Sequence, residues 1–237
     1  MNPEDVPNNL WLQVSQKHFR CFRASRVSAR SVPSTRKKTV DDLNRRFTFP
    51  TNHFDFVHSR LLATGLNRSR WPSYLRDVVR VLKPGGWAQM VEIYFNVQSD
   101  NGSITDEHAL RKWSTKYLSA LEDKKDLRIG SKLRTLMADA GFVEVDTKMI
   151  PLPLSAWSTG WFFKDPWEIT VTDSLISDLR MKGIGESNHE NAQQLLQSLA
   201  LYPLTQRLHM PPEVFTSLVA QAQREAADPT LKAYFPL

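Results

Sequence analysis

The residues best suited to chemistry in this sequence are His58, Ser59 and Arg60, which follow the strand-favouring run Phe54–Val57. Ligands of open α/β sheets bind at the carboxyl ends of strands, so side chains at this point would line a cleft. An imidazole with an ordinary pKa of roughly 6.5 could act as a general base towards a hydroxyl group. A structural role for a lone histidine is an equally good interpretation.

The other chemistry-bearing residues give weaker signals. Asp41 and Asp42 are adjacent carboxylates that could bind a ligand or simply cap a turn. The six histidines are scattered and Cys21 is the single cysteine, so we predict no metal centre and no internal disulfide. A lone cysteine fits a reducing compartment, and we expect the cytoplasm, with the nucleus as the alternative.

The positive charge of the chain belongs to one segment. Eight cations and no acid lie between Val14 and Thr39, and without them the net charge of +6 becomes −2. Clustered cations with Phe19 and Phe22 could bind nucleic acid, but a disordered basic insertion fits the pattern better. No apolar run reaches the roughly 18 residues that a membrane span needs, and we see no secretory signal.

A strand, a helix and a second strand would position His58. Residues 54–58 favour a strand, and Leu75, Val78, Val79 and Leu82 form the apolar stripe of a helix over 71–82. Lys83-Pro84-Gly85-Gly86 should end that helix, and 87–95 should form the next strand. Such a βαβ unit implies a parallel sheet with a right-handed crossover.

Further helices and strands are expected over the rest of the chain. We expect a helix over 106–122 with Thr105 as its N-cap, and a helix over 131–140 that ends at Gly141. Residues 142–150 alternate like a strand, which Pro151 and Pro153 should end. Helices over 190–201 and 212–227 and a last strand from Lys232 to Leu237 should follow. We interpret 1–237 as a single partial domain.

Four motifs in this order give the sequence a family likeness. "FDFVHSRLLATG", "VLKPGGW", "MVEIYF" and "LMADAGFVEV" resemble strands four to six of the fungal class I methyltransferases of secondary metabolism, which use S-adenosylmethionine. They are similar to the methyltransferase-like regulator associated with velvet proteins. The resemblance covers about 40–150 and, more loosely, 188–237. It implies an α/β, Rossmann-like fold with a mostly parallel sheet and flanking helices.

The resemblance also implies a site. Asp41 or Asp42 would accept a hydrogen bond from the adenine of S-adenosylmethionine, and His58, Ser59 and Arg60 would line the methyl-transfer cleft. None of the nine glycines forms the family's glycine loop, and there is no acidic residue at the end of a second strand to bind the ribose hydroxyls. We therefore expect a truncated or inactive form, with the first strands and the glycine loop upstream of Met1, and weak cofactor binding.

Two stretches interrupt the family pattern. Joining Leu10–Gln13 to Val40 would restore a continuous strand, which makes 14–39 an insertion. Omitting 160–177 would likewise give a smooth join, although its aromatic residues also suit a genuine lid loop. We interpret both as translated introns.

Three classes of function remain. The first is methyl transfer to a small-molecule substrate. The second is a non-catalytic, methyltransferase-like regulator that binds a protein partner. The third, nucleic-acid binding, rests on the basic segment alone and we place it last.

Overall fold

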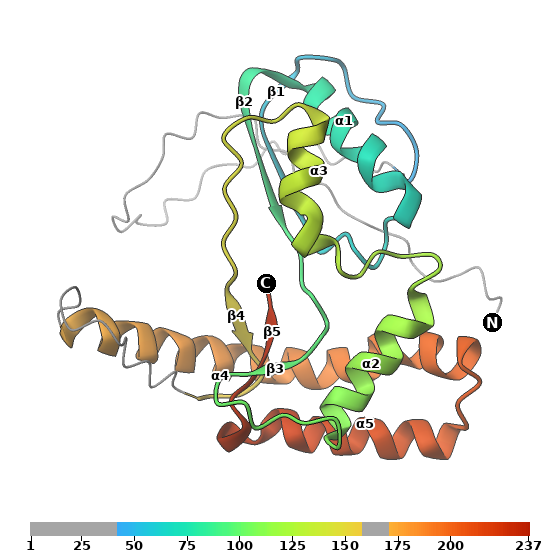
Figure 1. The fold of residues 1–237 in the computed structure, drawn as a ribbon, viewed down its shortest axis with the longest axis vertical. Helices are drawn as coiled ribbons and strands as arrows, with labels where there is room; N and C mark the ends of the chain where they lie inside the picture. The colour runs from blue at the N-terminus through green and yellow to red at the C-terminus, as the bar shows by residue number, and fades with distance from the viewer. Residues whose placement is uncertain (1–41, 158–170) are drawn as a thin grey trace, which may run out of the picture. The chain divides into compact units, whose positions relative to one another are not determined.

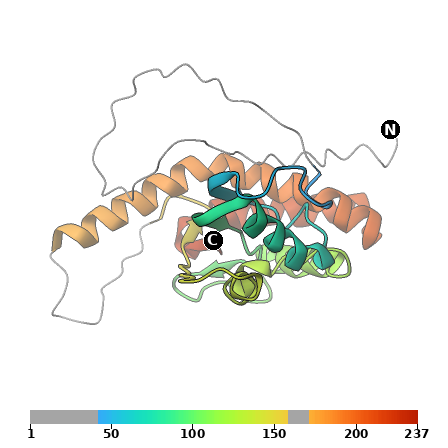
Figure 2. The same ribbon diagram turned by 90° about the horizontal axis from the view of Figure 1, so that it is seen from above.

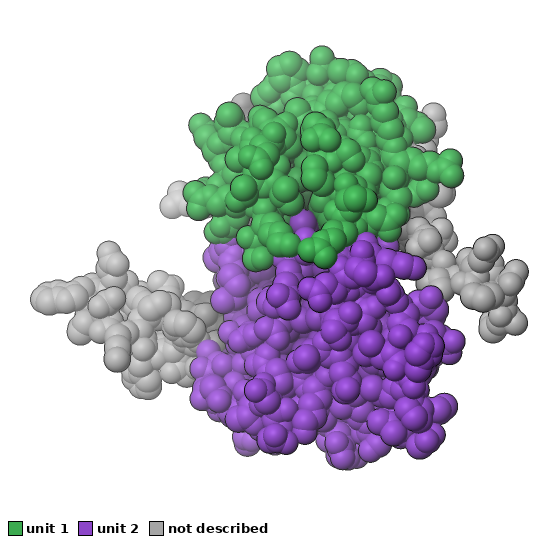
Figure 3. All heavy atoms as spheres, turned by 45° about the vertical axis from the view of Figure 1, so that its right-hand side comes forward, with its two compact units in different colours: residues 1–92, 131–147 green, residues 93–130, 148–237 purple. Residues whose placement is uncertain are grey.

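The computed structural model describes residues 42–157 and 171–237, with the backbone alone for 171–179. The chain forms two compact units, the first made of residues up to 92 with 131–147, and the second of 93–130 with 148–237 (Figure 3). No helix in the described part of the chain is long and apolar enough to cross a membrane.

The first unit is built on a parallel βαβ motif. Strand β1 (Phe54–Arg60) leads through the short η1 (Arg68–Arg70) into helix α1 (Trp71–Val81), and strand β2 (Leu82–Val91) pairs with β1 in parallel (Figure 1). Leu75 and Val78 are fully buried, as their helical spacing predicts. The α/β class and the parallel sheet are thereby confirmed. Of the expected sheet, the described residues contribute two parallel strands.

The Lys83–Gly86 turn becomes part of β2 rather than a separate loop. The register between the strands shifts between Phe54, which faces Leu82, and Phe56, which faces Trp87. Gly86 lies close to the neighbouring backbone, because a Cβ placed there would stand 2.9 Å from Lys83 O and 3.1 Å from Asp55 O. The predicted strand over 87–95 is therefore displaced: β2 begins and ends earlier.

Helix α3 (Leu133–Ala140) lies beside α1 in the first unit (Figure 1). It follows η2 (Ile129–Lys132) and ends at Gly141, whose φ of 106° is the left-handed conformation expected there. Around α1, aromatic rings pack edge to face, with Phe47–Tyr74 centroids 5.5 Å apart and Trp71–Tyr74 centroids 5.6 Å apart.

The second unit combines three helices with a small antiparallel sheet. Helices α4 (Val171–Tyr202) and α5 (Pro212–Ala227) run side by side, joined through the π-helical η3 (Pro203–Arg207), and α2 (Ala109–Leu121) packs on α5 (Figure 2). In the sheet, β5 (Ala233–Pro236) lies between β3 (Gln98–Ser99) and β4 (Pro151–Pro153), and η4 (Pro229–Leu231) precedes β5. The bounds of α5 are as predicted, and β5 lies within the range of 232–237 predicted for the last strand.

Helix α2 begins later than expected because a distant residue caps it. The Glu225 carboxylate of α5 accepts hydrogen bonds from the N–H groups of Ala109 and Leu110, at 2.9 and 2.8 Å. The Thr105 hydroxyl lies 3.0 Å from His108 Nδ1 instead. The prediction of Thr105 as the N-cap was therefore wrong, because tertiary contact supplied the acceptor.

The predicted strand over 142–150 is also wrong. Glu144 has a φ of 53°, which interrupts an extended run, and Val143 is 84% exposed. Ile150, the last residue of the predicted strand, exchanges backbone hydrogen bonds with Leu237. Strand β4 then begins at Pro151, the residue that was predicted to end the strand. β4 is an edge strand, where prolines without an N–H are tolerated.

Several predictions fall outside the described residues. These are the strand from 10–13 with Val40, the insertion over 14–39, Asp41, and the part of 160–177 that precedes α4. They stay predictions, as does the single-domain interpretation.

Candidate functional site

The carboxyl ends of β1 and β2 meet at one edge of the parallel pair. Arg60 and Val91 end the two strands as register partners, and Leu61 N–H donates to Val91 O at 2.9 Å. Leu61 has a φ of 57°, a left-handed conformation that is costly for leucine. The chain therefore turns sharply at the edge where α/β sheets bind ligands.

Glu92 holds this turn in place. Its carboxylate accepts hydrogen bonds from Leu62 N–H at 2.8 Å and Ala63 N–H at 3.0 Å, and the residue is 6% exposed. Burial raises the pKa of Glu92 to about 7, although the two backbone bonds act in the opposite direction. A carboxyl group with this pKa can exchange a proton near neutrality.

His58 lies within β1, two residues before the strand ends. Its Nδ1 is 3.1 Å from the side-chain oxygen of Gln89, its register partner on β2. The Gln89 amide oxygen can only accept, so this contact favours the neutral tautomer in which Nδ1 donates and Nε2 keeps its lone pair. His58 is half-buried and stacks on Phe56. In this tautomer the nitrogen that could accept a proton as a general base is Nε2.

Ser59 and Arg60 point to different environments. Ser59 is 2% exposed and accepts a hydrogen bond from Tyr74 OH of α1 at 2.9 Å. Burial raises the pKa of Tyr74, so the phenol keeps its proton as donor. Arg60 is exposed at the end of β1. The structure thus ties Ser59 into the packing with α1, while His58 is half-buried and Arg60 exposed.

Asp42 lies in an exposed turn. One carboxylate oxygen accepts from Asn44 N–H at 3.0 Å, and the other is 3.3 Å from Arg45 Nε. Asn44 connects this turn to the loop after β1, because its side chain donates to Gly65 O and accepts from Asn67 N–H. Asp42 is consequently brought to the loop that follows His58 and Arg60.

Sequence reasoning missed Glu92 and Asn44. Glu92 stood in an expected strand, and the only signal was an acid in an otherwise apolar run. No sequence signal predicts the hydrogen bond between the Asn44 side chain and Gly65 O. No group of three or more His, Cys, Asp or Glu side chains that could hold a metal occurs within residues 42–157 and 180–237.

Comparison with known proteins finds similarity to methyltransferases. Residues 20–90 match the family model described as "Methyltransferase domain". The chain is 24% identical over 233 residues to the "Protein-methionine methyltransferase laeA" of Emericella nidulans, with 95% of this chain and 57% of the relative covered.

Two further relatives carry related names. The "Secondary metabolism regulator LAE1" of Hypocrea atroviridis is 25% identical over 185 residues, which cover 77% of this chain and 48% of the relative. The "Probable methyltransferase tdiE" of Emericella nidulans is 30% identical over 119 residues, which cover 50% and 36%. The chain thus spans from about a third to 57% of the length of these relatives. The expected resemblance to fungal methyltransferases of secondary metabolism is confirmed.

Proposed function

We propose that this chain, a relative of the fungal LaeA-like methyltransferases, serves methyl transfer from S-adenosylmethionine to a small-molecule acceptor of secondary metabolism. One observation carries the proposal: the family match over 20–90 contains β1 and α1 and reaches Met90, one residue before β2 ends. The carboxyl edge of this βαβ motif is where such folds hold their ligands.

The roles follow from the geometry of that edge. His58 Nε2 would take the proton of an acceptor hydroxyl, with Gln89 holding the ring. Glu92 would fix the turn after β1, and Arg60 would face the acceptor. The cofactor would supply an activated methyl group on a sulfonium.

The residues fit the cofactor in part. The exposed Asp42 carboxylate can accept from an adenine amino group by exchanging its contact with the exposed Arg45. Within the printed sequence no glycines are spaced for the family's loop around the methionine end. Each lost hydrogen bond to a charged group weakens binding by about 1.5–3 kcal/mol. Losing two or three would lower the affinity by roughly two to six orders of magnitude.

A non-catalytic regulator is the second candidate. Relatives named as secondary metabolism regulators favour it. In either case we propose that the protein acts in the cytoplasm or nucleus, which fluorescence microscopy of a tagged chain would check.

Calorimetry with S-adenosylhomocysteine, the demethylated product, separates the two candidates. We expect little heat from residues 1–237 alone. A fusion that supplies the glycine loop expected of class I methyltransferases should bind in the micromolar range, and Asp42→Ala should weaken that binding. In this fusion His58→Gln should lower kcat while the exposed His209→Gln does not. A fusion without binding would favour the regulator.

A further inference from the structure

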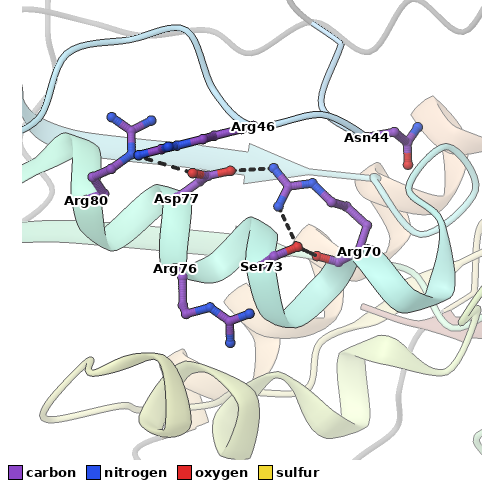
Figure 4. Close-up of a pocket in the computed structure, with 7 residues that line it drawn as sticks. All are labelled: Asn44, Arg46, Arg70, Ser73, Arg76, Asp77 and Arg80. Carbon is purple, nitrogen blue, oxygen red and sulfur yellow. Dashed lines mark hydrogen bonds and ion pairs between the residues drawn. The ribbon is translucent and has the colours of Figure 1, made fainter.

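A pocket of about 450 Å³ lies between α1 and the loop 42–49 of the first unit, and it does not contain His58 or Glu92 (Figure 4). Four of its residues are arginines and one is an acid, so the lining carries an excess of three positive charges. The lining residues are Asn44, Arg46, Arg70, Ser73, Arg76, Asp77 and Arg80.

Two of the arginines hold the pocket wall together. Arg70 donates to Leu43 O at 3.0 Å and to Ser73 Oγ at 2.7 Å, and it also bonds to Arg45 O and Asp77. Arg80 donates to two further carbonyls of the loop, Phe49 O at 2.8 Å and Phe47 O at 2.9 Å. These bonds fasten the loop to α1.

Asp77 cannot neutralise the remaining charge. It is 7% exposed, and one of its oxygens bonds to Arg70 while the other lies 3.5 Å from Arg80 Nε. Phe47 N–H also donates to Asp77, at 3.4 Å. Both oxygens are thus committed inside the pocket wall.

Arg46 and Arg76 supply the uncompensated charge. Arg46 stands in the fastened loop between Arg45 and Phe47, and its side chain runs towards Arg80, whereas Arg76 is directed away from Asp77 (Figure 4). Both are exposed, and neither has a hydrogen bond or ion pair among the described residues. Both line the same pocket, and like charges that line one pocket repel one another, a repulsion that an anion relieves.

We propose that this pocket binds a phosphate group, with Arg46 and Arg76 as its donors and Arg80 adding positive charge behind them. Guanidinium groups present planar pairs of N–H donors that match phosphate oxygens. Because Arg70, Arg80 and Asp77 already fix the loop, the anion has only to order the exposed side chains of Arg46 and Arg76, which would turn towards it. The proposed donors differ from the residues of the methyl-transfer proposal, although both sites share the loop 42–49.

Isothermal titration of the full chain with inorganic phosphate, at fixed ionic strength in chloride, tests this site. We expect saturable binding that the double variant Arg46→Gln, Arg76→Gln weakens at least about tenfold. The matched control is Arg134→Gln, an exposed arginine of α3 that does not line the pocket, which should change the Kd less than about twofold.

A second arm uses glycerol 3-phosphate, which distinguishes a phosphate ester from the free ion. Binding of either compound that depends on Arg46 and Arg76 supports the site and identifies the form it accepts. The proposal is overturned if neither compound binds, if the double variant binds as well as the original chain, or if Arg134→Gln weakens binding equally. Circular dichroism would establish that all variants are folded.

Discussion

Replacing Glu92 by glutamine should remove a large part of the pH dependence of stability. Burial of the carboxyl raises its pKa from 4.5 to about 7 in the folded chain. Below pH 4.5 the group is protonated in both states, and its contribution to stability is complete. As the pH rises towards 7, the unfolded chain releases a proton that the folded chain keeps, so the free energy of unfolding falls.

The size of this loss follows from the interval between the two pKa values. At about 1.36 kcal/mol per pKa unit, the loss amounts to about 3 kcal/mol between pH 4.5 and 7. Above pH 7 both states are ionised and the curve becomes flat. Glutamine cannot ionise, so its variant should lack this slope. Glutamine also presents only one acceptor oxygen to the two N–H groups of Leu62 and Ala63, which lowers stability by about 1–3 kcal/mol at every pH.

Urea denaturation from pH 4 to 8, followed by circular dichroism, measures the effect. The informative quantity is the difference between the original chain and Glu92→Gln, because other titrating groups cancel in it. We expect this difference to change by about 3 kcal/mol across the window. Glu144→Gln is the matched control, since Glu144 is exposed in the same unit. A difference that stays constant with pH, or an equal change in the control, would refute the reasoning.

Two substitutions test other parts of the first unit. Asp77→Asn should lower the free energy of unfolding by about 3–5 kcal/mol, because it leaves the buried Arg70 without its counter-charge. Asp55→Asn is the control: it removes the exposed pair with Lys83 and should lower the free energy of unfolding by less than about 1 kcal/mol. Urea denaturation would compare the two. Gly86→Ala should cost about 1–3 kcal/mol because its Cβ meets Lys83 O, while Gly183→Ala, with open space on helix α4, should raise the melting temperature slightly.

The parts of the fold predicted from sequence are those fixed by local signals. The apolar stripe of α1, the Pro212 start of α5 and the stop at Gly141 each depend on a few adjacent residues. The strand over 142–150 failed because alternation makes a strand only where a sheet edge receives it. The start of α2 failed because its cap, Glu225, is more than a hundred residues away.

The candidate site was predicted in a similar, incomplete way. His58 was predicted from its place after an apolar run, and in the structure it lies within β1, two residues before the strand ends, so its role stays a prediction. Its partner Gln89 depends on the register between β1 and β2, which is set by the irregular pairing at Phe54 and Phe56. The contact between Glu92 and the turn after β1 likewise depends on where both strands end. Neither can be read from local spacing.

Glu92 and Asp77 are two buried carboxylates of the first unit that have different kinds of partner. Asp77 faces the cations Arg70 and Arg80, which compensate its charge. Among the described residues Glu92 bonds only to backbone N–H groups, and these offset part of the effect of burial on its pKa. The turn after β1, next to His58 and Arg60, is therefore held by a group whose charge changes near neutral pH. The loop 42–49 is held instead by ion pairs and by hydrogen bonds to its carbonyls. We therefore expect a rise in pH through about 7 to destabilise the turn after β1 at a pH at which the loop 42–49 is still held.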